Sequence, residues 1–252
     1  MDKQLEERDR AEVLRSAEEA RKLVLEPIEA VQVKRYLNPP TDTAYRLEYA
    51  FHLLGDVRGK TVLDLGCGSG KNLVALVERG AHVIGLDVSP ELIAIAQQRL
   101  DKAGLKAIVR VGSAYETGLP DESVDVIFCI NLIHHLDIPT MLGEMLRLLK
   151  KAGRVIIQEP IRFSATYGRL RKMLPARENV SEYEHPLTRE ELTAVCAPFK
   201  PEGLRYFRLP LIPLFEQISS RQRLLWSMDR WLIRHMTIIN RYATVVVVRL
   251  VR

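Results

Sequence analysis

Three glycines on alternate positions follow an acidic residue in this chain, in the order Asp64, Gly66, Gly68 and Gly70. The apolar run that carries the acid predicts a buried strand, and the glycines predict a tight turn that leads into a helix. Glycine has no Cβ, so such a turn can take positive φ angles and let a ligand lie directly against the main chain. The segment therefore predicts a ligand-binding site.

The spacing of the glycines separates this turn from two other nucleotide-binding patterns. The dinucleotide fingerprint G-x-G-x-x-G needs glycine where this chain has Lys71, and the phosphate loop G-x-x-x-x-G-K-[ST] needs serine or threonine where it has Asn72. The pattern that remains is acid-x-Gly-x-Gly-x-Gly. It resembles motif I of the class I S-adenosylmethionine-dependent methyltransferases, and the resemblance extends over about residues 60–160.

A second acid, Asp87, ends the next predicted strand, 21 residues after Gly66. At this spacing other nucleoside-binding α/β folds use a carboxylate to accept hydrogen bonds from the ribose hydroxyls. The same carboxylate could instead only cap the helix that begins at Pro90. The resemblance implies that Asp87 binds the ribose of S-adenosylmethionine, and a third matching segment at 120–136 supports the likeness.

The resemblance also implies roles for other cofactor-binding residues. Asp64 would help to hold the methionine end of the cofactor, whose ammonium is positive, and Val88 would pack on the adenine. Many family members have an aspartate at the position of Ser113, so the adenine amine would here need a serine hydroxyl or a backbone carbonyl. No metal is expected. The expected cofactor-binding residues are Tyr36, Asp64, Gly66, Cys67, Gly68, Gly70, Asp87, Val88, Ser113, Ala114 and Asn131.

His134 and His135 follow the predicted fourth strand and are the candidates for a catalytic base. A sulfonium methyl is already activated, so positioning can supply about 7–11 kcal/mol of barrier reduction and a base is secondary. An imidazole, with an unperturbed pKa of about 6.5, suits an oxygen or nitrogen nucleophile. A His-His-Leu sequence at this place could equally be structural. His185, on the predicted cap, is a weaker candidate for a base, and Glu159 at the end of the fifth strand could face the pocket or pair with an arginine.

The composition indicates one large α/β domain. A chain of 252 residues with 47% hydrophobic residues can form a substantial core. No apolar stretch approaches the roughly 20 residues of a membrane span, and the charged N-terminal region lacks a signal-peptide core, so a cytoplasmic protein is expected. Cys67, Cys129 and Cys196 are too widely separated to suggest a disulfide framework or a zinc site.

The net charge of +5 permits an anionic partner but is small for a protein of this length. Residues 160–236 hold 13 Lys and Arg against 8 Asp and Glu, and so account for the surplus. Arg169, Arg171 and Lys172 are compatible with a carboxylate or phosphate on the substrate, although surface arginines usually only interact with solvent.

Predicted strands and helices alternate along the middle of the chain. The strands are apolar on both faces and the helices are amphipathic, which indicates a parallel sheet covered on both sides. The resemblance implies a Rossmann-like α/β fold, with a seven-stranded sheet in the order 3-2-1-4-5-7-6 and an antiparallel last strand. Strands are expected at about 60–65, 81–86, 106–111, 123–130, 153–159, 203–209 and 242–250, and helices at about 2–25, 41–54, 71–79, 90–103, 138–150, 188–196 and 215–236.

The N-terminal residues 1–45 are expected to form a helical lid or strap on a methyltransferase domain of residues 46–252. Pro27 and Asn38-Pro39-Pro40 mark hinges, and Asp42 is the expected cap of the helix at 41–54. Tyr36 would close over the cofactor. Tyr45 and Arg46 are weaker candidates for such a contact.

Two insertions, at about 160–186 and 210–241, are expected to cap the substrate. Loops that leave the carboxyl ends of parallel strands emerge where ligands bind, and both insertions begin there. In the second insertion a basic amphipathic helix is expected. Such a helix could lie on an anionic membrane and collect a lipid-like substrate, or pack in the core or in a dimer. Its predicted apolar stripe is Ile218, Leu225, Met228 and Leu232, widened by Leu224, Trp226 and Trp231, opposite Arg223, Ser227, Arg230 and Arg234.

These residues favour methyl transfer from S-adenosylmethionine to the oxygen, nitrogen or carbon of a small-molecule acceptor, anionic or lipid-like in character. A methyltransferase that acts on nucleic acid or protein is the alternative. A nucleic-acid enzyme often has an Asn-Pro-Pro-Tyr motif, but here Asn38-Pro39-Pro40 is followed by Thr41 and precedes the glycine turn. A non-catalytic module that only binds the cofactor is a third possibility. The oligomeric state is left open.

Overall fold

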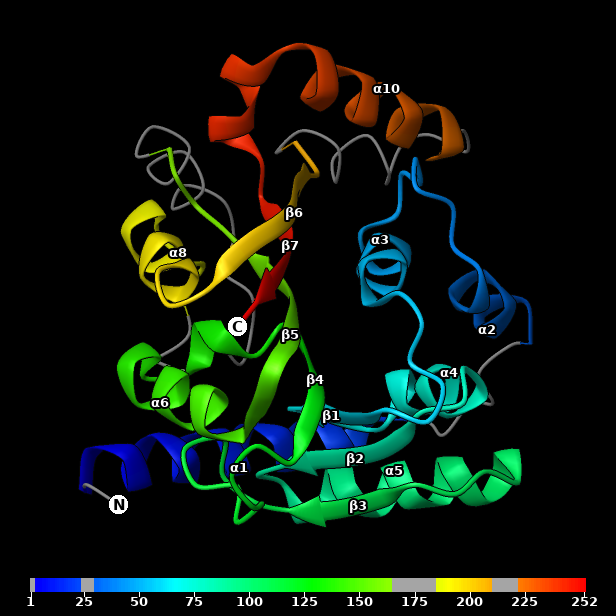
Figure 1. Ribbon diagram of the computed structural model, residues 1–252, viewed down its shortest axis with the longest axis vertical. Coiled ribbons are helices and arrows are strands. Elements are labelled where there is room, and N and C mark those ends of the chain that lie inside the picture. The colour runs from blue at the N-terminus through cyan, green and yellow to red at the C-terminus, as the bar shows by residue number, and fades with distance from the viewer. Residues whose placement is uncertain (1–2, 24–29, 165–184, 210–221) are drawn as a thin grey trace.

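A seven-stranded sheet forms the centre of the molecule (Figure 1). The computed structural model describes residues 3–23, 30–164, 185–209 and 222–252. The strand order is β3-β2-β1-β4-β5-β7-β6, and β7 pairs antiparallel with β5 and with β6. The predicted fold class and strand order are therefore confirmed. The strands are β1 (Thr61–Leu65), β2 (His82–Asp87), β3 (Ile108–Val111), β4 (Val124–Ile130), β5 (Leu149–Pro160), β6 (Lys200–Phe207) and β7 (Val245–Val251).

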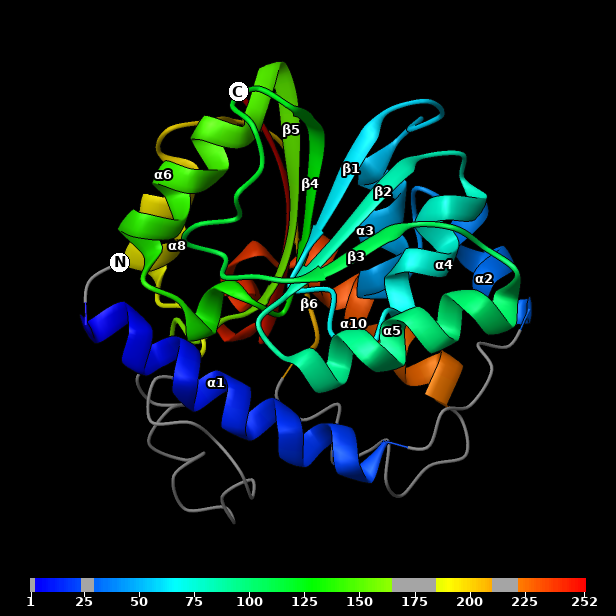
Figure 2. The same cartoon turned by 90° about the horizontal axis from the view of Figure 1, so that it is seen from below.

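Helices cover both faces of the sheet (Figures 1 and 2). One face carries α6 (Ile138–Leu148) and α8 (Arg189–Cys196). The other carries α3 (Arg46–Leu54), α4 (Lys71–Glu78) and α5 (Pro90–Ala103), with α2 (Ala30–Leu37) packed outside α3 and α4. The remaining described helices are α1 (Lys3–Lys22), α10 (Gln222–His235) and the short 3-10 helices η1 (Ile133–His135) and η2 (Thr237–Tyr242).

Alternate residues of each central strand enter two separate cores. In β4, Val126 and Phe128 pack with α3, α4 and α5, whereas Ile127 and Cys129 pack with α6 and α8. A sheet covered on both faces needs apolar residues at every position of its inner strands, which explains the continuous apolar runs in the sequence. The two cores thus fix the sheet between the helices, and the carboxyl ends of its strands can position the residues of a site.

The predicted helix ends are partly right. Ser89 caps α5 by accepting a hydrogen bond from the Leu92 N–H at 3.2 Å, and the capping box of α8 joins Thr188 and Glu191 as predicted. The predicted cap at Asp42 is wrong. The helix begins later, at Arg46, because the Thr43 hydroxyl accepts the Tyr45 N–H at 3.0 Å and holds residues 41–45 in a turn.

Two other boundaries differ from the sequence predictions. Hinges were predicted at Pro27 and Asn38-Pro39-Pro40 without a separate helix between them, yet Ala30–Leu37 forms α2. The helix predicted at 138–150 ends at Leu148, because Leu149 already pairs with Val124 of β4 ahead of a shift in register. The local sequence pattern could not predict α2 or the end of α6, since both depend on packing against distant elements.

The apolar stripe predicted for the second insertion is not a single buried face. In α10 Asp229 and Ile233 are buried, whereas Met228 and Trp231 are 53% and 57% exposed. Hydrogen bonds explain this orientation. The Asp229 carboxylate accepts the backbone N–H groups of Arg208 and Leu209 at 2.9 and 2.8 Å, and these bonds turn this side of α10 inward. The predicted residues before 222, and the side chains of Arg223 and Leu224, lie outside the described part.

Helix α1 runs across the carboxyl edge of β1, β2 and β3 (Figure 2). It also contacts α5. Its inner side buries Ser16, while most of its other residues carry charge. Within the described residues no helix is long and apolar enough to cross a membrane, and the cytoplasmic location stays a prediction.

Candidate active site

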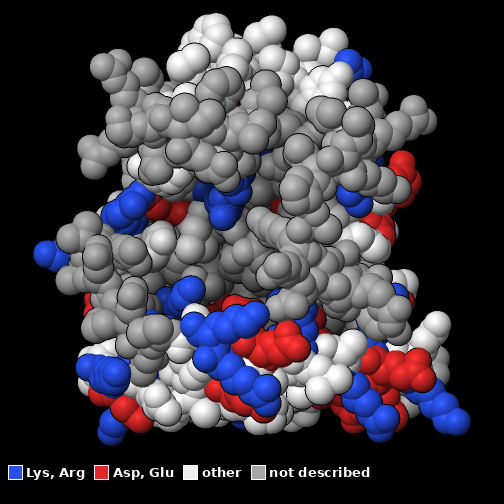
Figure 3. Space-filling view, turned by 180° about the vertical axis from the view of Figure 1, so that it is seen from behind, with Lys and Arg blue, Asp and Glu red and all other residues white. Residues whose placement is uncertain are grey.

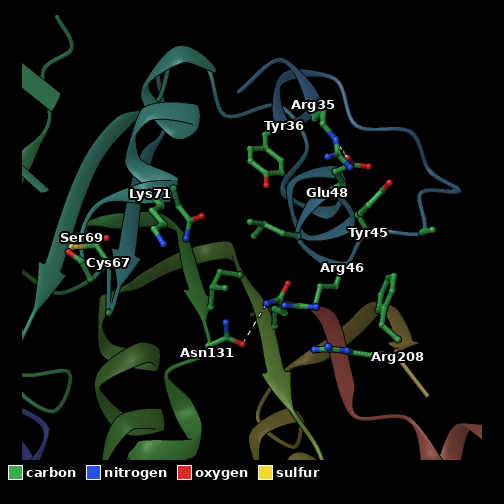
Figure 4. A pocket seen from close by; sticks show the side chains of 18 of the residues that line it. Arg35, Tyr36, Tyr45, Arg46, Glu48, Cys67, Ser69, Lys71, Asn131 and Arg208 are labelled. Carbon is green, nitrogen blue, oxygen red and sulfur yellow. Dashed lines mark hydrogen bonds and ion pairs between the residues drawn. The ribbon is translucent and has the colours of Figure 1, made fainter. Parts of the chain in front are cut away.

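Two cavities meet at the glycine turn. The larger has a volume of about 520 Å³ and lies between the turn, α3 and α10 (Figure 4). The smaller has about 40 Å³ and lies between the ends of β1 and β2 and the helix α1. Gly66 lines both cavities. The turn therefore separates two spaces of very different size.

The three glycines of the turn are required for different reasons. All have positive φ, at 73° for Gly66, 51° for Gly68 and 75° for Gly70. A Cβ on Gly66 would lie 2.8 Å from Leu132, and one on Gly70 would lie 2.9 Å from Ala96. A Cβ on Gly68 would meet nothing within 4 Å. Only Gly68 therefore presents bare backbone to open space, and the other two allow the turn to pack.

Asp87 fixes the turn to the end of β2. Its Oδ2 accepts the Gly68 N–H at 2.8 Å and its Oδ1 accepts the Ser89 N–H at 3.0 Å. Burial raises the pKa of this carboxyl, and the two backbone hydrogen bonds oppose the shift. A carboxylate has about four acceptor positions, so two bonds leave capacity for a ligand. Asp87 lines the small cavity together with Val88 and Ala114.

Asp64 is an ionisable group without an obvious structural purpose. It is 1% exposed, and its Oδ2 has no hydrogen-bond partner among the described residues. Burial, and then the charge of Asp87, raise the pKa of Asp64 to about 8. A buried carboxylate oxygen left unpaired is costly, and a cationic ligand would relieve it. Asp64 lines neither cavity directly.

Helix α1 forms the outer wall of the small cavity through Arg8, Asp9 and Glu12. Asp9 is hydrogen-bonded to Ser113, the position at which the sequence departs from the family. The Ser113 hydroxyl also accepts the Tyr115 N–H at 3.2 Å. Ser113 is therefore engaged by α1 and by its own loop, and it does not line either cavity.

Glu159 holds the segment that carries the two histidines. Its Oε1 accepts the N–H groups of Leu132 and Ile133 at 2.7 and 2.8 Å, and its Oε2 lies 2.7 Å from Nδ1 of His134. Glu159 is fully buried. These three bonds make Glu159 a structural anchor at the end of β5, and they turn His134 away from both cavities.

His135 has a different environment. It lines the small cavity, with Nδ1 3.3 Å from the Glu12 carboxylate of α1. Burial, and then the neighbouring His134, lower the pKa of His135 to about 4. At neutral pH this imidazole is uncharged and only weakly basic. His185 lies beside this segment, since its backbone N–H donates to the His134 carbonyl at 3.3 Å, but its half-exposed side chain has Nε2 3.6 Å from Glu191 and lines neither cavity. A histidine base stays a prediction.

The other predicted cofactor residues fall on the side of the large cavity. Tyr36 stacks on Phe51 with ring centroids 4.8 Å apart and lines this cavity, as do Cys67 and Asn131. Asn131 has a positive φ of 56°, which is uncommon outside glycine and occurs at functional sites. The structure thus divides most of the predicted set between two cavities joined at the turn, while Asp64, Gly70 and Ser113 line neither.

The large cavity also contains functional candidates that sequence reasoning missed or underrated. Arg46 was only a weak candidate, and Gln158, Phe207, Arg208 and Asp229 were not proposed for the site. Their positions in the chain are scattered, and no short motif connects them. The predicted cations Arg169, Arg171 and Lys172 lie outside the described residues. Among the described residues no cluster of three or more His, Cys, Asp or Glu could hold a metal.

Comparison with protein families identifies the central part of the chain. Residues 63–157 match the family model described as a methyltransferase domain. A ubiquinone biosynthesis O-methyltransferase of Azorhizobium caulinodans is 29% identical over 116 residues, 46% of this chain and 44% of that protein. A demethylmenaquinone methyltransferase of Tropheryma whipplei is 33% identical over 132 residues, 50% of this chain and 54% of that protein. The chain spans about half the length of these curated relatives.

Solved structures show the same fold over a longer stretch. A geranyl diphosphate C-methyltransferase of Streptomyces coelicolor A3(2) superimposes with a TM-score of 0.60 at 17% identity, covering 90% of this chain and 89% of that chain. An S-adenosylmethionine-dependent methyltransferase of Mesorhizobium loti gives 0.56 at 22% identity, covering 83% and 98%. Together these findings show that residues 63–157 are similar to a methyltransferase domain, and that the chain has the fold of S-adenosylmethionine-dependent methyltransferases over most of its length.

Proposed function

We propose that this protein is an enzyme that transfers a methyl group from S-adenosylmethionine to a small-molecule acceptor in the large cavity. The observation that carries the proposal is the glycine turn with its two carboxylates. Gly68 leaves bare backbone beside open space, Asp87 keeps free acceptor capacity, and Asp64 has an unpaired buried oxygen. These features fit, in turn, close approach of a ligand, a sugar diol and a cationic amino group.

The cofactor, when bound, supplies a methyl group on a sulfonium that needs no further activation. The protein must then bind and orient the two partners and exclude water, which fits a site with a rigid base and an enclosing cap. The proposed cofactor residues are those predicted from the sequence, with Asp64 and Asp87 as the two charged contacts. Neither histidine is required for displacement, although a base would help a protonated acceptor.

Helix α1 must shift for the donor to bind as proposed. Ligand pockets usually have volumes of about 300–1,000 Å³, and the space between α1 and Asp87 has only about 40 Å³. Arg8, Asp9 and Glu12 occupy the side from which a nucleoside would have to enter. We therefore propose that α1 is the lid over the donor, a role the sequence suggested for the whole of residues 1–45.

The relatives support a small molecule as acceptor. Their names refer to ubiquinone, demethylmenaquinone and geranyl diphosphate. Figure 3 shows Lys and Arg interspersed with Asp and Glu on the lower part of the rear face, where no broad field of one sign covers the described residues. This favours a small acceptor, anionic or lipid-like, over nucleic acid. Contact of α10 with a membrane stays a proposal that its exposed Met228 and Trp231 support.

Calorimetry with the full chain tests donor binding. S-adenosylhomocysteine should bind the unaltered protein, and Asp87→Ala should weaken binding at least about 100-fold, since it removes the sugar contact and releases the turn. Asp101→Ala, an exposed change on α5, is the matched control and should bind normally. No heat and no rise in melting temperature with the unaltered protein would refute donor binding.

A labelled-methyl assay separates an enzyme from a binding module. The protein is incubated with S-adenosylmethionine carrying a labelled methyl group and with fractionated small molecules from cells. Label in the small-molecule fraction that disappears with Asp87→Ala supports methyl transfer. Tight donor binding with no label in any fraction, or label only in nucleic acid or protein, would overturn the small-molecule assignment.

A further inference from the structure

Four cationic side chains from four separate segments line the large cavity. Arg35 comes from α2, Arg46 begins α3, Lys71 begins α4 and Arg208 follows β6. In Figure 4, Arg46 and Arg208 both extend from the same side of the view towards Asn131. Positively charged residues from distant parts of the sequence thus surround one cavity.

The three carboxylates that line the same cavity each have partners of their own. Glu48 pairs with Arg35 and accepts the Thr43 hydroxyl. Both oxygens of Asp229 accept backbone N–H groups. Glu19, on α1, lies 3.5 Å from Arg15. Glu48 and Asp229 therefore help to hold α3 and α10 in place around the cavity, whereas Glu19 pairs with Arg15 within its own helix.

Arg208 is held in an uncommon conformation that aims a positive group at the cavity. Its φ is 64°. Its N–H is bound by Asp229, and its carbonyl accepts both the N–H and the hydroxyl of Thr244, at 2.9 and 2.8 Å. Non-glycine residues in this backbone region are rare and persist when the surroundings fix them, typically at ligand sites. The backbone is thus pre-organised before any ligand arrives.

Arg46 adds its charge to that of a helix end. It is the first residue of α3, and the N-cap residue Tyr45 makes no side-chain hydrogen bond to the helix. The N-terminus of a helix carries partial positive charge and presents N–H groups to anions. Arg46 and the N-terminus of α3 therefore both present positive charge on the wall of this cavity, which would attract an anion.

The rest of the cavity suits an apolar body with one polar group. Tyr45 and Trp226 pack edge to face with ring centroids 4.5 Å apart, and Tyr36 and Phe207 also line the space. Gln158 is 2% exposed, and its Oε1 has no hydrogen-bond partner among the described residues. Its amide nitrogen lies 3.4 Å from Asn131. A hydroxyl or amine on the ligand would satisfy this buried oxygen.

We propose that the methyl acceptor carries a carboxylate or phosphate group held by Arg46 and Arg208, with an apolar or aromatic body against Tyr45 and Trp226. The proposal rests on the proposed function, since it names the acceptor class of that site. Arginine is suited to this task because its planar guanidinium can bind an oxyanion with two hydrogen bonds.

The test measures binding of simple anions to the full chain saturated with S-adenosylhomocysteine. The probes are phenyl phosphate and benzoate, with benzamide as the neutral control of nearly the same shape. The variants are Arg46→Met and Arg208→Met, which keep an apolar stem of similar length. Arg58→Met is the matched control, because Arg58 is exposed, pairs with Asp56 and does not line the cavity.

The proposal expects at least one of the two anions to bind about tenfold or more tightly than benzamide. Arg46→Met and Arg208→Met should each lower the affinity for that anion about tenfold, while Arg58→Met should leave it unchanged. A preference for phenyl phosphate assigns a phosphate, and a preference for benzoate assigns a carboxylate. Equal binding of all three probes by the unaltered protein would overturn the proposal even if a variant failed to fold.

The donor titration on the same samples separates the two levels of inference. If S-adenosylhomocysteine binds and the anions show no preference, the anionic acceptor is refuted and methyl transfer stands. If the anions bind through Arg46 and Arg208 but no donor binds, methyl transfer is refuted, and the acceptor assignment that rests on it is refuted with it.

Discussion

The two cavities are built from the chain in different ways. The wall of the small cavity comes largely from strand ends and turns within residues 65–136, closed by α1. The wall of the large cavity comes from segments between Glu19 and Asp229 that meet only in the folded protein. The difference indicates that a short motif can encode the proposed donor side, whereas the proposed acceptor side depends on tertiary assembly and so can change freely.

One short segment is the partition between them. Asn131 lines the large cavity, while Leu132, His135 and Leu136 line the small one. Glu159 holds this segment from behind through three bonds. A change at Glu159 should therefore affect both cavities at once, unlike changes at residues that line only one.

Glu159→Ala should have the largest effect on stability. The change leaves two backbone N–H groups and His134 without their buried partner, so a loss of about 3–5 kcal/mol in the free energy of unfolding is expected. Urea denaturation gives this value. The control Glu116→Ala changes an exposed carboxyl in the loop between β3 and β4. Its free energy of unfolding should stay within about 0.5 kcal/mol of that of the unaltered protein. If both variants were equally stable, Glu159 would not anchor the partition.

Alanine at two of the glycines should separate folding from binding. Gly66→Ala places a Cβ against Leu132 in addition to its positive φ, so it should destabilise the protein by more than about 2 kcal/mol. Gly68→Ala carries only the φ penalty of about 1–2 kcal/mol, yet its methyl group points into open space at the turn. Gly68→Ala should therefore weaken the binding of S-adenosylhomocysteine in calorimetry, whereas Gly66→Ala should mainly lower the melting temperature. The reverse pattern would place the ligand elsewhere.

Donor affinity should rise with pH because of Asp64. With its pKa raised to about 8, this carboxyl is mostly protonated at pH 6.5. Pairing with a cationic amino group requires the ionised form, so the dissociation constant for S-adenosylhomocysteine should fall about tenfold between pH 6.5 and 8. Asp64→Asn should bind weakly at every pH in this range. A flat profile for the unaltered protein would show that Asp64 does not meet the ligand's charge.

Changes at the histidines should have the smallest effect on turnover. His134 is turned away from both cavities, and His135, with a pKa lowered to about 4, is a weak base. In the labelled-methyl assay, His135→Asn should alter kcat by less than about tenfold. The pH profile of kcat for the unaltered protein should show no titration near pH 6.5. A loss of about 100-fold or more with normal donor affinity would instead identify a catalytic base.

The features that the sequence predicted for the proposed donor side are all local. The apolar runs, the glycine spacing and the acid at Asp87 each depend on neighbouring residues, and the parallel sheet brings their ends together. The sequence could not show that Gly66 and Gly70 serve packing, because Leu132 and Ala96 are contacts made only on folding. Nor could it show that Ser113, where the family motif is broken, is engaged by Asp9 of α1.

Most residues of the proposed acceptor side could not be predicted from the sequence. Arg208 and Gln158 follow no motif, and their importance comes from a backbone conformation and from an unpaired oxygen. The charge surplus after residue 160 did point to anions, but towards Arg169, Arg171 and Lys172. In α10 the apolar stripe gave the wrong buried face, because the two backbone N–H groups bound by Asp229 outweigh hydrophobic periodicity there.

A crystal structure of the full chain with S-adenosylhomocysteine is the most direct measurement of how the two cavities divide the work. The expected result has the sugar hydroxyls on Asp87, the amino group beside Asp64, α1 moved from its place across the strand ends, and the large cavity still open for the acceptor. A nucleoside seated among Arg46, Arg208 and Trp226, with Asp87 away from the sugar, would contradict it.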